Sequence, residues 1–209
     1  MWLPQSVLLI FTGSLLFVQV TTGMVQEPEI VSKFIQNNLV EWKAPEEIIK
    51  KYPYYWSGYD FDGRPLWILE FGKWNVRSIA ESDKGTLDLF NIYIDQVVYN
   101  AFQSISHNLT VETSSEVIAI VDMEGWSTSQ VSRANVAYLA KVFNYLVPTL
   151  YKYLYHVYII NTNFVAESMI NSLRPILGSL MERVEIMGTL KSKWLPRILS
   201  QIPQDQLPQ

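Results

Sequence analysis

The chain has 209 residues, of which 49% are hydrophobic and 17% are charged, and its formal net charge is −4. This length suits one α/β domain with a substantial core and is too short for two. The net charge excludes the strongly basic surface typical of nucleic-acid binding and implies no general attraction to an anionic membrane. There is no cysteine, and the two histidines, His107 and His156, stand far apart. We therefore expect no disulfide, no histidine-based metal site and no cofactor.

The first 23 residues form an apolar segment that differs from the rest of the chain. Residues 7–20 have about the length of a signal-peptide core and are short for a membrane span. Small residues follow at 21–23, although no basic residue precedes Lys33. We predict a signal-peptide-like segment at residues 1–23, with a structural strand or an incorrect start as alternatives. A true signal peptide would place the protein outside the cell or in the endomembrane lumen, where the glycosylation acceptor at 108–110 would matter, and otherwise the protein would be cytoplasmic.

The next part of the chain indicates helix, then a turn, then a strand. Residues 27–51 carry apolar side chains at helical spacing, with Pro45 placed at a possible first turn. Residues 52–56 are expected to be an aromatic linker. Residues 58–65 have the aspartates, glycine and proline of a tight turn. Residues 66–71 are apolar at nearly every position, which predicts an interior strand of a parallel sheet.

Helices and strands are then expected to alternate to the end of the chain. Residues 75–84 are a polar connection, and the helix that ends at residue 147 is expected to be broken by Pro148. This alternation predicts a parallel sheet with helical crossovers. The predicted elements are helix 87–105, strand 117–121, a helix led in by 127–132 and ending at 147, strand 157–161, helix 164–177, strand 184–188 and helix 193–201.

Four short motifs together resemble a known family. In chain order they are GYDFDGRPLWI, VDMEGWS, YIINTNFV and RVEIMG, each at a predicted strand entry or exit. In this order and spacing they resemble the CRAL-TRIO lipid-binding domains, the family of tocopherol, retinaldehyde and phosphatidylinositol transfer proteins. The resemblance assigns residues 57–209 to the lipid-binding domain and residues 24–56 to a remnant of the family's N-terminal helical region. The closing segment QIPQDQLPQ lacks the aromatic-Gly-Gly that follows in other members.

The resemblance implies a mostly parallel sheet that forms the floor of a hydrophobic pocket, covered by a mobile gate helix. One lipid molecule would bind between them, on an apolar strand face that protein does not fill. Without the resemblance, the same residues would be interpreted as ordinary core. The expected floor residues are Trp67, Leu69, Val117, Ala119 and Ile159. The expected gate is helix 164–177, with Phe164, Met169, Ile170, Leu173 and Ile176 as lining.

The sequence departs from the family pattern where polar anchors are expected. Phosphatidylinositol-binding members pair a glutamate before the third strand with a basic residue that opens the fourth. Arg183 occupies the basic position, but the Pro-Glu of the pair falls on Tyr151 and Lys152. The hydroxyl residues that some members carry on the second strand fall on Val117 and Ala119. Because buried polar ligand groups need partners, we expect a cargo more apolar than an inositol phospholipid, with Arg183 either at the lipid headgroup or in solvent.

Two other functions were weighed against lipid binding. The chain has no G-x-S-x-G elbow, P-loop or G-x-G-x-x-G. Asp122 and Glu124 end a strand where open sheets gather active sites, but without a basic or metal partner they are expected to cap a turn rather than catalyse a reaction. We predict a monomeric lipid-binding and lipid-transfer protein that is not an enzyme, does not bind nucleic acid and touches membranes transiently through the gate region. The alternative is a lipid-free scaffold for protein contacts.

Overall fold

Helices and strands alternate along residues 26–106 and 115–208, which the computed structural model describes. Both the signal-peptide-like segment 1–23 and the glycosylation acceptor at 108–110 lie outside these ranges. Within them, no helix has the length and apolar character needed to cross a bilayer. The elements are α1 (Glu29–Gln36), α2 (Glu46–Lys51), β1 (Tyr54–Tyr59), β2 (Pro65–Leu69), η1 (Phe71–Lys73), α3 (Val76–Ala80), α4 (Lys84–Ser106), β3 (Val117–Asp122), η2 (Thr128–Gln130), α5 (Arg133–Tyr153), β4 (Leu154–Ile160), α6 (Phe164–Leu177), η3 (Gly178–Arg183), β5 (Val184–Ile186), α7 (Lys191–Leu199) and η4 (Gln204–Gln206).

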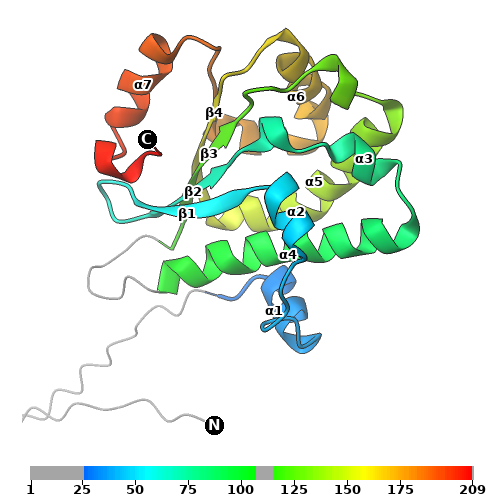
Figure 1. The fold of residues 1–209 in the computed structure, drawn as a ribbon. Coiled ribbons are helices and arrows are strands. Elements are labelled where there is room, and N and C mark those ends of the chain that lie inside the picture. Colours follow the sequence, from blue (N-terminus) through cyan, green and yellow to red (C-terminus); the bar gives the residue numbers. More distant parts are fainter. Residues whose placement is uncertain (1–25, 107–114, 209) are drawn as a thin grey trace, which may run out of the picture.

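The five strands form one sheet in the order β1-β2-β3-β4-β5. β1 pairs antiparallel with β2, and every other pair is parallel. Helices α3 to α6 lie on one side of this sheet, and α7 with the C-terminal residues covers the other (Figure 1). The predicted α/β fold with a mostly parallel sheet is therefore confirmed.

Alternation along the strands divides the core between the two faces of the sheet. In β3, Ile118 and Ile120 point toward α7, while Val117 and Ala119 point toward α4 and α5. Both faces are buried, so the strand is apolar at every central position, as interior strands of parallel sheets are. The α7 side is closed by Ile198, which is fully buried against the sheet.

The turn before β2 is fixed by a buried carboxylate. Oδ1 of Asp60 accepts hydrogen bonds from the backbone N–H of Asp62 at 3.0 Å and of Arg64 at 2.7 Å. The Arg64 guanidinium returns to the same carboxylate at 2.8 Å and stacks over the ring of Tyr155 at 3.6 Å. Gly63 has a φ of 80°, which a residue without a Cβ adopts freely. The predicted turn is confirmed, and it locks the start of β2 against β4.

The expected linker at residues 52–56 instead enters β1, the edge strand. Its aromatic side chains pack on the sheet: the Tyr54 ring lies 5.9 Å from that of Trp67 and 5.3 Å from that of Tyr93. Aromatic residues favour strands because they cover neighbouring side chains on a pleated surface. Burial raises the pKa of Tyr54 to about 12, so its hydroxyl stays neutral at physiological pH.

Three helix boundaries also differ from the sequence expectation. Pro148 lies inside α5 and does not end it, because the residues on both sides of it, Leu146 and Thr149, are held against the same apolar cavity. The expected connection at 75–84 contains α3, which Asn75 caps by accepting from Ser78 N–H. The expected helical region at 27–51 is two helices, α1 and α2, separated by a non-helical stretch.

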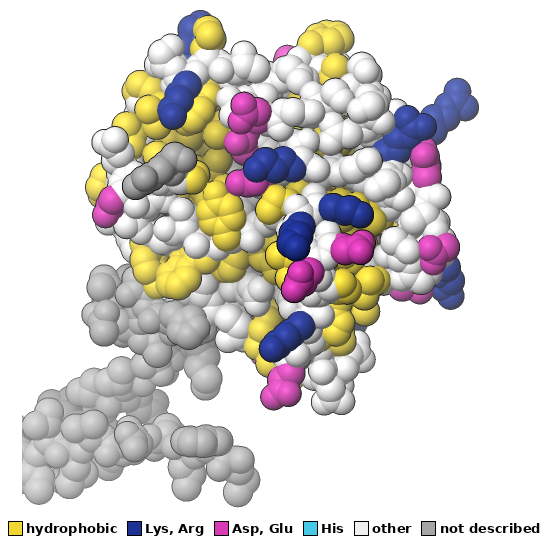
Figure 2. Space-filling view, viewed as in Figure 1, with side chains coloured by type: hydrophobic (Ala, Val, Ile, Leu, Met, Phe, Trp, Pro, Cys, Tyr) yellow, Lys and Arg dark blue, Asp and Glu magenta, His cyan; other side chains and the backbone are white. Residues whose placement is uncertain are grey.

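On the face viewed in Figure 2, hydrophobic side chains gather over β1, and opposite charges sit beside one another over α1 and α2. That charged surface contains ion pairs one helical turn apart, such as Lys33–Glu29 at 2.7 Å and Lys50–Glu46 at 3.3 Å. Exposed pairs of this kind stabilise a helix by only about 0.3–0.5 kcal/mol. The two N-terminal helices are consequently held to the domain mainly by their apolar faces.

Candidate functional site: an apolar cavity between the sheet and three helices

An apolar cavity of about 270 Å³ lies between the sheet and helices α4, α5 and α6. No charged residue of the described chain lines it. The α7 face of the sheet, in contrast, is filled by packed side chains. The two faces of one sheet therefore differ: one is sealed by protein, and the other borders open space.

The floor of the cavity is the sheet face predicted from strand alternation. β2 and β3 each contribute every second residue, and β4 continues the same surface with Val157. In a strand, alternate side chains point to one face, so the residues that form the floor follow from this alternation. All five predicted floor residues line the cavity: Trp67, Leu69, Val117, Ala119 and Ile159.

Helix α6 lines the cavity with three of its five predicted residues, Met169, Ile170 and Leu173. Phe164 does not line it, because this first residue of α6 points outward and is 82% exposed. Ile176 packs partly buried against the core but also lies outside the lining. Leu177, the next residue along the helix, takes the place facing the cavity.

Helices α4 and α5 supply a large part of the wall that sequence reasoning assigned to ordinary core. The signal was present as a continuous apolar stripe on α4 with helical spacing. Such a stripe looks the same whether protein or a ligand fills the space that it faces. The α4 residues of the wall are Phe90, Ile94, Val97, Val98, Ala101, Phe102 and Ile105, and those of α5 include Tyr138, Leu139, Val142, Phe143, Leu146 and Leu150.

The polar atoms of the wall are mostly engaged within the protein. Burial raises the pKa of Tyr138, so this residue remains a neutral phenol. A ligand inside the cavity therefore finds few free donors or acceptors, and a hydrocarbon group suits this space best. Four donations account for the ring groups: Trp67 Nε1 to Ser104 Oγ at 3.0 Å, Trp74 Nε1 to the Pro53 carbonyl at 3.1 Å, the Tyr138 hydroxyl to Asn91 Oδ1 at 2.9 Å, and the Tyr153 hydroxyl to the Gln26 carbonyl.

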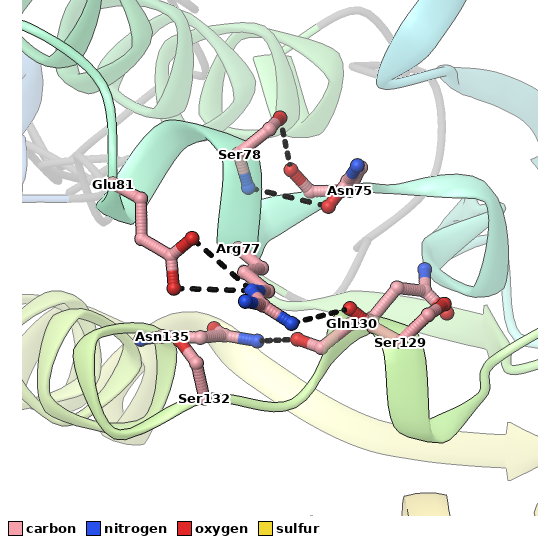
Figure 3. A network of polar contacts seen from close by, with 8 residues as sticks. All are labelled: Asn75, Arg77, Ser78, Glu81, Ser129, Gln130, Ser132 and Asn135. Atoms are coloured by element: carbon pink, nitrogen blue, oxygen red, sulfur yellow. Dashed lines mark hydrogen bonds and ion pairs between the residues drawn. The ribbon is translucent and has the colours of Figure 1, made fainter.

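One end of the cavity is fixed by the polar network that joins α3 to α5 (Figure 3). Arg77 donates to the Glu81 carboxylate at 3.0 Å and to the Ser129 carbonyl at 3.2 Å. Asn135 donates to the Gln130 carbonyl, and the Gln130 side chain donates to the Gly72 and Trp74 carbonyls, each at 3.1 Å. These bonds hold η1 and α3, and with them Trp74 and Val76 of the cavity wall, in one position relative to α5.

Arg183 lies outside the cavity lining and is bound by protein groups. It forms an ion pair with Glu116 at 3.5 Å, donates to the Leu154 carbonyl and lies 5.0 Å above the ring of Tyr151. A glutamate before β3 thus takes the place of the acidic partner that is missing at Lys152. From the sequence, Arg183 was expected either in solvent or at a lipid headgroup. In the structure it contacts protein groups instead.

Asp122 and Glu124 are arranged as a turn rather than as a reactive pair. Asp122 Oδ1 accepts from the Glu124 backbone N–H at 2.9 Å and from Asn161 Nδ2 at 2.8 Å. Across the described ranges, no three His, Cys, Asp or Glu side chains come together as a metal site. The property that distinguishes this side of the sheet is its apolar cavity.

Comparison with known proteins gives one family. Residues 49–209 match the model of the CRAL/TRIO domain. A CRAL-TRIO domain-containing protein of Saccharomyces cerevisiae, YKL091C, is 26% identical over 188 residues, which cover 86% of this chain and 57% of that protein. The crystal structure of Sfh5 has the same fold, with a TM-score of 0.55 at 10% identity over 75% of this chain and 57% of its own. The chain thus spans less than two thirds of both relatives. Since the family model matches most of its length, this protein belongs to the CRAL/TRIO domain family.

Proposed function

We propose that the protein binds a single lipid molecule, with its hydrocarbon part in the cavity over the sheet, and transfers it between membranes. The observation that carries this proposal is the apolar space lined by β2, β3, β4 and three helices. The family as a whole is associated with lipid binding, which agrees with this use of the space. We further propose that the protein acts as a monomer, without catalysis and without nucleic acid.

The apolar lining of the cavity supports an apolar occupant. A hydrocarbon group in this space would gain contacts with the lining side chains and would need no hydrogen-bond partner.

Transfer requires contact with a membrane, and we propose that the start of α6 provides it. Phe164 and Leu190, at 82% and 58% exposure, are two of the three most exposed large apolar side chains in the described part of the chain. A hydrogen bond from Thr162 N–H to the Met187 carbonyl, at 3.1 Å, joins the chain segments that carry them. Since α6 lines the cavity with its inner side, insertion of Phe164 into a bilayer would act on the same helix that covers the lipid.

Native mass spectrometry of the purified protein tests the proposal directly. A carrier is expected to retain a non-covalent adduct with the mass of one lipid, which solvent extraction then identifies. If the protein is free of adduct and does not take up lipid from vesicles either, lipid binding is refuted and the scaffold alternative stands. Replacing Phe164 by Ser should slow transfer between vesicles while the amount of lipid bound at equilibrium stays the same.

A further inference from the structure

A second pocket, of about 300 Å³, adjoins one end of the apolar cavity. It lies between the start of α1 and the last turns of α5, on the side of the domain where α1 packs against α4 (Figure 1). Pro28, Thr149 and Tyr153 line both spaces. The apolar cavity and a second pocket of different composition therefore border on the same three residues.

The second pocket carries four charged side chains, Glu27, Glu29, Lys33 and Lys152, of which two are paired with each other. Lys33 and Glu29 form an ion pair at 2.7 Å, and Glu27 accepts from the Ser32 hydroxyl at 2.5 Å. Lys152 differs from Lys33, because it forms no ion pair with any residue in the described part of the chain.

The Lys152 ammonium is held instead by a neutral group. Its Nζ donates to the amide oxygen of Gln26 at 2.6 Å and lies 5.3 Å from the centre of the Tyr153 ring. The Tyr153 hydroxyl donates to the backbone carbonyl of the same Gln26. An amide oxygen carries no net charge, so it attracts an ammonium less strongly than a carboxylate or phosphate oxygen would at the same distance.

We propose that this α1–α5 pocket binds the anionic end of an amphiphilic cargo whose single hydrocarbon chain occupies the apolar cavity. This inference rests on the proposed lipid-binding function and names the class of lipid. The anionic group, a carboxylate or a phosphate monoester, replaces the Gln26 amide at Lys152. The Thr149 hydroxyl, one helical turn before Lys152 and at the border of both spaces, lies on the path between the chain and the anionic group.

The volume of the cavity favours one chain. Pockets that enclose drug-sized ligands measure about 300–1,000 Å³, and the 270 Å³ here lies just below that range. A two-chain phospholipid or a lipid with a large polar headgroup needs more room. No charged residue of the described chain lines the cavity, whereas Lys152 lines the adjoining pocket, where it would be a partner for a charged end.

The inference is tested by measuring how strongly three ligands with the same hydrocarbon chain displace one fluorescent hydrophobic probe. The ligands are oleate, its uncharged methyl ester and 1-oleoyl lysophosphatidate, measured at pH 8 on the full chain. For the wild type, we expect at least one of the two anions to bind about tenfold more tightly than the methyl ester, which is about 1.4 kcal/mol. The order of oleate and lysophosphatidate then shows whether a carboxylate or a phosphate is preferred.

Three variants test whether the Lys152 side chain causes the preference for anions over the methyl ester. Lys152→Met keeps the aliphatic stem and should bind both anions as weakly as the methyl ester, with methyl ester binding unchanged. Lys152→Arg keeps the charge and should retain the preference. Lys193→Met, at an exposed lysine of α7 outside the pocket, is the matched control and should behave as the wild type.

Two results would overturn the inference while leaving the lipid-binding function intact. One is a methyl ester that binds the wild type as tightly as both anions, and the other is an anion preference that persists in Lys152→Met. If none of the three ligands displaces the probe and no lipid co-purifies, the proposed function itself fails, and the inference fails with it.

Discussion

Substitution of Ala119 by Phe tests whether the space over the sheet is available to a guest. Ala119 is the central residue of β3, pairs with Trp67 of β2 and Val157 of β4, and points into the cavity. A phenyl group at this position would occupy part of the 270 Å³ without moving the floor. Filling an existing apolar space adds contacts, so we expect the free energy of unfolding to stay constant or to rise by as much as about 1.5–3 kcal/mol.

Ala166 provides the matched control. It lies on α6, is fully buried in the same core and is not part of the cavity lining. A phenyl group there must displace close-packed neighbours, which costs about 1–3 kcal/mol or more. The two alanine-to-phenylalanine changes are thus expected to move stability in opposite directions, although both residues are buried.

Two measurements on each variant decide the outcome. Urea unfolding gives the free energy of unfolding, and competition with a fluorescent hydrophobic probe gives the affinity of the cavity. We expect Ala119→Phe to fold normally and to lose more than tenfold in affinity. If Ala119→Phe is destabilised as much as Ala166→Phe, the space is not available, and the reasoning from the cavity is wrong.

Three further predictions concern other parts of the chain. Removal of residues 1–23 should leave the melting temperature unchanged, since we expect this segment to lie outside the folded domain, and a drop of several degrees would contradict that. Arg183→Ala should lower the free energy of unfolding by about 1 kcal/mol through loss of its pair with Glu116, while lipid binding stays within tenfold of the wild type. Burial lowers the pKa of His156 below its ordinary value of 6.5, so its neutral form stabilises the fold above pH 6.5 and this contribution is lost as the pH falls through the lowered pKa. His156→Phe should therefore lose less stability than the wild type between pH 7 and pH 5, and equal losses in urea titrations would refute this role.

The sheet and its cavity face follow from the sequence because strand alternation is a local property. Once residues 66–71 and 117–121 are recognised as neighbouring strands, every second side chain is assigned to one face. The turn at Asp60 and Gly63 is local in the same way. For this reason the order of elements and the side chains that share one face of the sheet were predictable from the strands, whereas the expectation that this face borders a cavity came from the family resemblance.

The walls of the cavity could not be predicted in the same way, because the sequence of a helix does not show whether the space it faces is filled by protein. The apolar stripe of α4 has the same spacing against packed protein as against open space. Phe164 shows the reverse problem: it carries the apolar character of a core residue, but its position at the first residue of α6 turns it to the outside. Pro148 was expected to break the helix, but it lies inside α5. The packing of the surrounding turns of α5 outweighs the hydrogen bond that proline removes.

No local sequence pattern predicts the pocket between α1 and α5. Gln26 and Lys152 are separated by 126 positions in the chain, and neither residue type is unusual where it stands. Only the docking of α1 on α4, supported by the ring of Phe34 5.0 Å from that of Tyr99, brings them together. A contact of this kind is a property of the fold and becomes visible only in three dimensions.

The difference between the two faces of the sheet explains how the domain can contain an open cavity and remain folded. On the α7 face, Leu66, Ile118 and Tyr158 are completely buried, and Ile198 and Ile202 close over them. This packed layer holds β2, β3 and β4 together whether or not the opposite face is occupied. For the proposed lipid binding, this leaves the helical face as the side where a guest would enter and leave, because α6 and the α1–α5 junction border the space there. The packing behind the sheet would then keep the floor of the cavity in place.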